Sequence, residues 1–156
     1  YTFAGFRELG RTMKDLVEFH TNNKYLFMAY NQRQLKEAGK IVANHQKLPV
    51  SQVFDNYEKV LHQIFNKAAG ISANINVLMH LLGYFSKQLK AAEKAYFLEQ
   101  MQLFRSRRIP LIGLTAILQA WVIRFEQDYL ADQTYFEPFP GELMHITDSG
   151  KGRIIK

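Results

Sequence analysis

Apolar residues recur at the spacing of an α-helix along almost the whole chain of 156 residues. No segment alternates apolar and polar residues for long enough to predict a half-buried strand. Thr12 with Asp15 and Asn31 with Gln34 fit the capping-box pattern that marks the start of a helix. Pro49 interrupts the apolar pattern between two of the expected helices. We therefore predict an all-α fold, a single compact domain of about six to seven helices.

The expected helices cover residues 12–30, 31–44, 51–70, 74–89, 91–108, 110–126 and 129–135. The helix over 74–89 is apolar on most of its sides, which predicts a largely buried central helix. No linker or internal repeat divides the chain, so we expect one helical domain over residues 1–156. Its core should cover about residues 12–143, and residues 144–156 should form a flexible tail.

The chain contains no cysteine, which excludes disulfides, iron–sulfur ligation, thiolate zinc sites and thiol nucleophiles. We expect no cofactor in this domain. The longest apolar-rich run, residues 109–125, carries Pro110, Gly113 and Arg124 and is shorter than the roughly 20 apolar residues that span a bilayer. The first residues lack the features of a signal peptide, so we expect a cytoplasmic protein that does not enter a membrane.

The chain carries a formal net charge of +6, which favours an anionic partner such as nucleic acid. Many soluble proteins are equally basic and bind no polyanion, so the charge alone does not identify the partner. The chain begins with Tyr1 rather than Met, which suggests a processed product or the C-terminal part of a longer chain.

Three polar residues, Asn76, His80 and Tyr84, follow one another at intervals of four in the apolar helix over 74–89. Their side chains should rise along one stripe of that helix, with Lys87 near its end. A buried amide or imidazole without a hydrogen-bond partner costs on the order of 1–3 kcal/mol. The stripe therefore predicts either a structural network between two helices or a polar pocket that opens to solvent.

A second pair, His20 and Lys24, is also spaced by four residues in the expected helix over 12–30. If the two stripes face each other, they form one cleft suited to an anion such as a phosphate or a carboxylate. The candidate anion-binding residues are His20, Lys24, Asn76, His80, Tyr84 and Arg105. The alternative is that Lys24 is a solvated charge and His20 lies at the boundary of the core.

No sequence motif identifies a catalytic residue or a metal site. Glu58 with His62 and Glu142 with His145 have helix-compatible spacing, but a dimetal carboxylate site needs matching motifs on several helices. The chain has no nucleophile elbow, and its glycines stand singly rather than in a phosphate loop. We therefore assign no catalytic residue and no metal ligand.

A basic stretch, RSRRIP over residues 105–110, follows the aromatic Phe104. Basic groups beside an aromatic ring suit phosphate contact and base stacking. The candidate nucleic-acid-binding residues are Lys87, Lys90, Arg105, Arg107 and Arg108. The alternative is that the arginines only complement the dipole at the C-terminal end of a solvated helix.

Four blocks of sequence are similar to the signature blocks of the YbgA-like family of bacterial domains of unknown function. The blocks are FHTNNKYLFMAY, NVLMHLLGYFSKQL, FRSRRIPLI and YLADQTYFEPFPGEL, in this order between about residues 16 and 143. The family pattern falls on Phe19, His20, Lys24, Met28, Asn76, His80, Gly83, Tyr84, Phe85, Arg105, Pro110, Leu111, Tyr129, Gln133 and Tyr135. The resemblance implies an all-α domain that occurs alone or behind a TudS-like domain, an iron–sulfur-dependent module that removes sulfur from thiolated pyrimidines.

The chain departs from the family pattern at three places. Tyr30 stands where the family usually has histidine, Arg107 where it has glycine, and residues 119–121 read Gln-Ala-Trp where it has Lys-His-Tyr. Two histidines that are frequent in the family are therefore missing, which favours binding over catalysis in this domain.

We expect a non-catalytic helical module that presents an RNA, a thiolated tRNA, to a sulfur-removing TudS-like domain in cis or in trans. Its phosphate contacts would be Lys24, Lys87, Arg105, Arg107 and Arg108. One alternative is a small enzyme in which His20 and His80 perform acid–base chemistry on an anionic metabolite. Another is a protein-interaction scaffold that docks a partner on its apolar helix over 110–126 and its acidic C-terminal segment.

Overall fold

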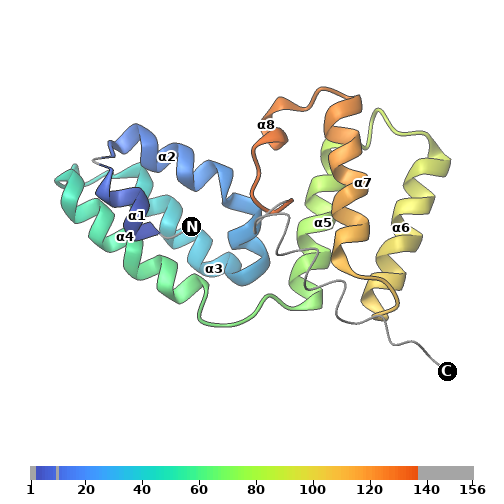
Figure 1. Cartoon of the computed structure of the whole chain (residues 1–156), viewed down its shortest axis with the longest axis horizontal. Coiled ribbons are helices and arrows are strands. Elements are labelled where there is room, and N and C mark those ends of the chain that lie inside the picture. Colours follow the sequence, from blue (N-terminus) through green and yellow to red (C-terminus); the bar gives the residue numbers. More distant parts are fainter. Residues whose placement is uncertain (1–2, 10, 137–156) are drawn as a thin grey trace.

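The computed structural model describes residues 3–9 and 11–136, and within this part of the chain it is helical without any strand (Figure 1). The helices are α1 (Phe3–Glu8), α2 (Met13–Asn22), α3 (Lys24–Ala43), α4 (Val50–Ile64), α5 (Ile71–Phe85), α6 (Ala91–Arg105), α7 (Leu111–Arg124) and α8 (Asp128–Ala131). The all-α prediction is confirmed. The expected tail over 144–156 and Glu142 with His145 lie outside the described residues. None of the described helices combines the length and the apolarity that a membrane span requires.

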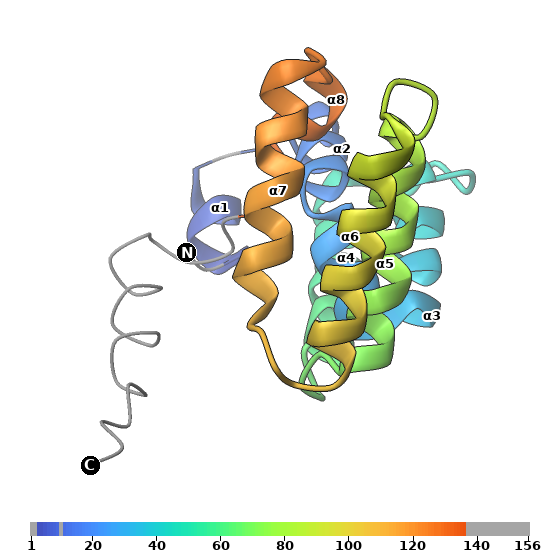
Figure 2. The same ribbon diagram turned by 90° about the vertical axis from the view of Figure 1, so that its right-hand side faces the viewer.

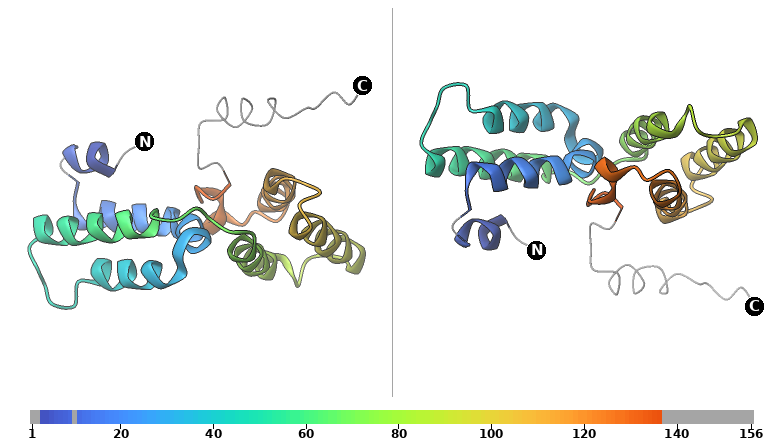
Figure 3. Two further views of the ribbon diagram at one scale, coloured as in Figure 1. Left: turned by 90° about the horizontal axis from the view of Figure 1, so that it is seen from below. Right: turned by 90° about the horizontal axis from the view of Figure 1, so that it is seen from above.

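The fold has two halves that meet between α3 and α5. Helix α3 packs against α2 and α4 in the first half, and α5 packs against α6 and α7 in the second. Figures 2 and 3 show α5, α6 and α7 running alongside one another, with α5 nearest to α3. The predicted central helix is therefore α5, which contacts both halves of the protein.

Two of the predicted helix starts are confirmed by side-chain caps. Thr12 Oγ1 accepts a hydrogen bond from the Asp15 backbone N–H at 3.4 Å, and the Asp15 carboxylate accepts one from the Thr12 N–H at 2.8 Å. Asn31 leaves the helical conformation inside α3, and its Oδ1 accepts a hydrogen bond from the Gln34 N–H at 3.1 Å. Side-chain caps of this kind satisfy the N–H groups that a helix start leaves without partners.

The helix that the sequence predicts over residues 12–30 is wrong in one respect, because it breaks at Asn23 between α2 and α3. The buried side chain of Gln133, from the segment after α8, fills this break. Its Nε2 donates a hydrogen bond to the Thr21 carbonyl at 2.7 Å, and its Oε1 accepts one from the Tyr25 N–H at 3.4 Å. Thr134 Oγ1 donates to Asn23 Oδ1 at 2.6 Å. At this break, hydrogen bonds to the segment after α8 therefore replace hydrogen bonds within the helix.

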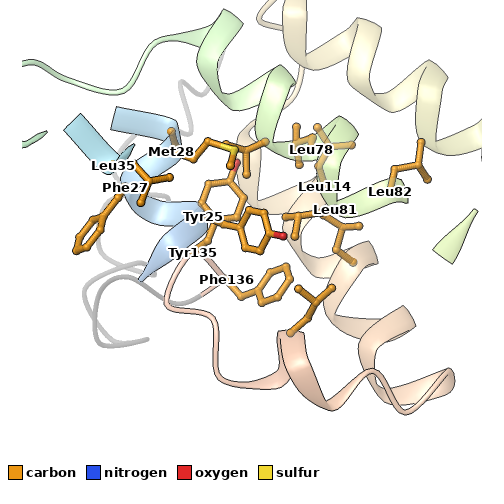
Figure 4. Close-up of a cluster of buried hydrophobic side chains, with 14 of the residues drawn as sticks. Tyr25, Phe27, Met28, Leu35, Leu78, Leu81, Leu82, Leu114, Tyr135 and Phe136 are labelled. Atoms are coloured by element: carbon orange, nitrogen blue, oxygen red, sulfur yellow. The ribbon is translucent and has the colours of Figure 1, made fainter. Parts of the chain in front are cut away.

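The segment after α8 also forms a hydrogen bond with α5. Tyr135, which is buried, donates its hydroxyl to Asn74 Oδ1 at 2.8 Å, and Asn74 Nδ2 donates to the Gly70 carbonyl at 3.0 Å. Figure 4 shows Tyr135 beside Tyr25 of α3 and Leu81 of α5, in the cluster where the two halves meet. We refer to residues 133–136 as the connecting strut, because they bond to the α2–α3 break and to α5.

Replacing Asn74 with alanine should lower the free energy of unfolding by about 1–3 kcal/mol, because the buried Tyr135 hydroxyl then loses its acceptor. The matched control is Asn76→Ala, two residues along the same helix, which should change stability by less than about 0.5 kcal/mol because that side chain is half-exposed. Urea denaturation followed by circular dichroism measures both changes. Equal losses in the two variants would contradict the assignment of Asn74 to the strut.

Candidate functional site

The polar stripe on α5 exists as the spacing predicts, but it lies on the outside of the helix. His80 is exposed, Asn76 is half-buried and the neighbouring Met79 is exposed as well. The buried amide in this helix is Asn74, which is not among the predicted site residues. The sequence contains one indication that Asn74 is buried. Asn74 lies four residues before the apolar Leu78, so both side chains are on the same side of α5, and this side is buried.

Three tyrosines meet at the C-terminal end of this stripe. Tyr84 of α5 shares a hydrogen bond with the buried Tyr25 of α3, with 2.7 Å between the hydroxyl oxygens. On its other side the Tyr84 ring stacks on Tyr129 of α8, with 5.9 Å between the ring centroids and 23° between the planes. Tyr84 keeps 36% and Tyr129 keeps 44% of its surface exposed. Tyr129 is absent from the sequence-based site, although it belongs to the family pattern.

Burial raises the pKa of the Tyr25 phenol above its ordinary value, and the hydrogen bond with Tyr84 raises it further. Tyr25 therefore stays neutral at physiological pH and holds the Tyr84 ring in place. Lys24 lies beside Tyr25, with its Nζ 5.4 Å from the centroid of the Tyr25 ring. Lys24, His80, Tyr84 and Tyr129 form what we call the tyrosine face.

His20 directs its ring towards Tyr57 of α4. Its Nδ1 is 3.0 Å from the Tyr57 hydroxyl, and a Cβ built on Gly39 of α3 would lie 3.7 Å from its Nε2. The helix breaks at Asn23 between His20 and Lys24, so the two residues lie on different helices, although the charge of Lys24 still acts on the His20 imidazole. Within residues 3–9 and 11–136 no hydrogen bond or ring contact joins His20 with His80.

The structure divides the expected basic residues into two groups at opposite ends of α6. Lys90 caps the start of this helix of 15 residues and Arg105 ends it, so the two groups lie roughly 22 Å apart along the helix axis. Lys87 lies between α5 and α6, in the connection that follows Tyr84. Arg105, Arg107 and Arg108 are exposed at the far end, beside the start of α7, so Arg105 is not part of the tyrosine face.

The tyrosine face lies on the surface, because His80, Tyr84 and Tyr129 are all exposed. Two hollows of about 330 Å³ and about 200 Å³ lie elsewhere, the first at the α3–α4 turn and the second between α2 and the segment after α8. Lys24, His80 and Tyr84 line neither of these hollows. In the part of the chain that the structure describes, no cluster of His, Asp and Glu could hold a metal ion.

The burial of His20 predicts a pH-dependent stability. Burial lowers the pKa of the His20 imidazole below its ordinary value, and the positive charge of Lys24 lowers it further. In the unfolded chain this histidine takes up a proton near pH 6.5, whereas the folded protein takes it up only at lower pH. The unfolded state therefore binds more protons in this interval, so stability should fall as the pH drops from about 7 to about 5.

Replacing His20 with glutamine should flatten this pH dependence. The control is His62→Gln, an exposed histidine on α4, which should leave the loss on acidification in place. Urea midpoints measured at several pH values test both variants. An unchanged slope in His20→Gln would show that another group causes the loss.

The sequence places the chain among proteins of unknown function. A sequence profile of the family described as Protein of unknown function (DUF1722) matches residues 24–140. The chain is also 25% identical over 145 residues to the uncharacterized protein YbgA of Escherichia coli (strain K12), and the alignment covers 92% of this chain and 85% of the relative. No solved structure matches the chain. These similarities confirm the resemblance to YbgA-like domains, and the chain belongs to the DUF1722 family.

Proposed function

We propose that this domain binds RNA and that the tyrosine face holds unpaired nucleotides. The observation that carries the proposal is the exposed, mutually stacked pair of Tyr84 and Tyr129. Stacking of one base on an aromatic side chain contributes about 1–3 kcal/mol and tolerates any base. Because Tyr25 fixes the Tyr84 hydroxyl, the ring is already ordered before the ligand arrives and loses little entropy on binding.

The charged residues around the tyrosine face favour one side for the phosphates of a bound RNA. Lys24 lies beside Tyr25, and Lys87 follows Tyr84 by three residues, so both cations can reach a backbone that runs past the rings. Asp128 and Asp132 flank Tyr129 in the sequence and are exposed. We therefore expect the phosphates to approach from the side of Lys24 and Lys87.

The RNA that we propose is a thiolated tRNA, presented to a sulfur-removing TudS-like domain in cis or in trans. This step rests on the family resemblance and on the lack of cysteine, because iron–sulfur chemistry then needs a different domain. Arg105, Arg107 and Arg108 would be a second contact, and a ligand that reaches them from Lys90 must span roughly 22 Å. A folded tRNA is large enough to do so. Acid–base chemistry by His20 and His80 gains no support, since His20 contacts Tyr57 instead.

The test of the stacking role compares three tyrosine variants in a tRNA-binding titration at low salt. Tyr84→Ala should weaken binding by about tenfold, which corresponds to about 1.4 kcal/mol of lost stacking. Tyr84→Phe keeps the ring but loses the hydrogen bond to Tyr25, so its affinity should lie between those of Tyr84→Ala and the unmodified protein. Tyr96→Ala removes an exposed tyrosine of α6 that is not part of the tyrosine face and should have no effect. Absence of tRNA binding at low salt, or equal binding by all variants, would refute the proposal.

The salt dependence of binding tests the phosphate contacts. Lys24→Gln and Lys87→Gln should each reduce the slope of log affinity against log salt by about one unit. The control is Lys59→Gln on the exposed side of α4, which should leave the slope unchanged. The double variant Arg105→Ala with Arg107→Ala tests the second contact in the same way. If its slope is unchanged, the arginines do not touch the RNA.

A further inference from the structure

The outward surface of α7 is apolar, whereas the outward surface of a helix is normally charged. Ile112 is 38% exposed and Ile123 is 78% exposed. In contrast, Thr115 is buried and its hydroxyl donates back to the Ile112 carbonyl at 3.2 Å. Thr115 of this helix thus faces inward, while Ile112 and Ile123 face water.

The exposed residues form one continuous stripe along α7. Their spacing of three or four residues puts them on the same side of the helix. The stripe consists of Ile112, Gly113, Ala116, Ala120 and Ile123. The opposite side of α7 packs against α5, α6 and α8. Figure 2 shows α7 on the left of the group that it forms with α5 and α6.

The two ends of the stripe carry opposite charges. Arg107 and Arg108 are exposed just before α7 begins, and Glu126 and Asp128 are exposed just after it ends. The remaining cation, Arg124, already pairs with Glu93 of α6. The surface is therefore basic at one end, apolar in the middle and acidic at the other end.

We propose that this surface binds a second copy of the same chain, with the two α7 helices antiparallel about a twofold axis. In this arrangement the basic end of each copy lies against the acidic end of the other, and the axis passes near Ile117, midway between Arg108 and Glu126. A parallel arrangement would place like charges together. Gly113, Ala116 and Ala120 have little or no side chain, so the two helix backbones approach closely and the isoleucines pack beside them.

The contact is small, which sets the expected affinity. A helix of 14 residues is roughly 21 Å long, so one pair of helices buries less surface than a permanent dimer. We expect a reversible dimer with a dissociation constant of about 1–100 μM. The stripe and the tyrosine face share no residue, but Arg107 and Arg108 belong both to the basic end of this surface and to the proposed second RNA contact, so the dimer is tested without RNA.

Sedimentation equilibrium of the whole chain without RNA tests the proposal. The mass should rise from 18.2 kDa towards twice that value as the protein concentration increases. Ile123→Glu should weaken the dimer at least tenfold, and circular dichroism should show that the exposed substitution leaves the fold intact. The control is Val17→Glu, an exposed apolar residue of α2, which should still dimerise.

Charge reversal tests the antiparallel register. Arg108→Glu and Glu126→Arg should each weaken the dimer, and the double variant should recover it because both contacts across the axis are restored. A monomer at every concentration, or a dimer insensitive to Ile123→Glu, would overturn the proposal. So would a double variant that dimerises no better than either single variant. In a further experiment, residues 137–156 are removed and hydrogen exchange of the α7 amides is measured. If the protein is a monomer and these amides then exchange faster, that segment covers the stripe instead of a second copy, and the proposal is overturned.

Discussion

The fold depends on one side chain, Gln133, lying in the break between α2 and α3. A helix end leaves carbonyls and N–H groups without partners, and burying them unpaired would cost several hydrogen bonds. Gln133 supplies one donor to Thr21 and one acceptor to Tyr25, so the chain can change direction inside the protein. Two residues later Tyr135 bonds to Asn74 of α5. The connecting strut therefore fixes the direction of α3 and the position of α5 together.

The features that local sequence controls could be predicted, and those that distant contacts control could not. The all-α class follows from helical spacing, and the cap at Thr12 is formed by residues three apart. The break at Asn23 interrupts a favourable helical pattern, and its compensation comes from Gln133, more than 100 residues away. The sequence pointed to Asn76 as the amide in the polar stripe, whereas the buried amide is Asn74. Apolar residues surround both in the sequence, and only the tertiary packing decides which side of α5 is covered.

The structure separates the candidate surfaces that the sequence had combined into one cleft. Lys24 and Tyr84 reach a common surface because the break turns α3 towards α5, although they are distant in the chain. The arginines at the end of α6 belong to another region, next to the stripe on α7. If that stripe joins two copies, the dimer carries two tyrosine faces. Two linked weak contacts then hold one long RNA more tightly than either contact alone.

The late position of the connecting strut affects how the protein is made. A ribosome releases the chain from its N-terminal end, so α2 and α3 emerge well before Gln133, which follows Tyr25 by 108 residues. At bacterial and eukaryotic elongation speeds of about 5–20 residues per second, this interval lasts roughly 5–20 s. During that time Gln133 is not available to bond to Thr21 and Tyr25. The newly synthesised polypeptide is therefore a candidate client for chaperones that bind at the exit tunnel until translation is nearly complete.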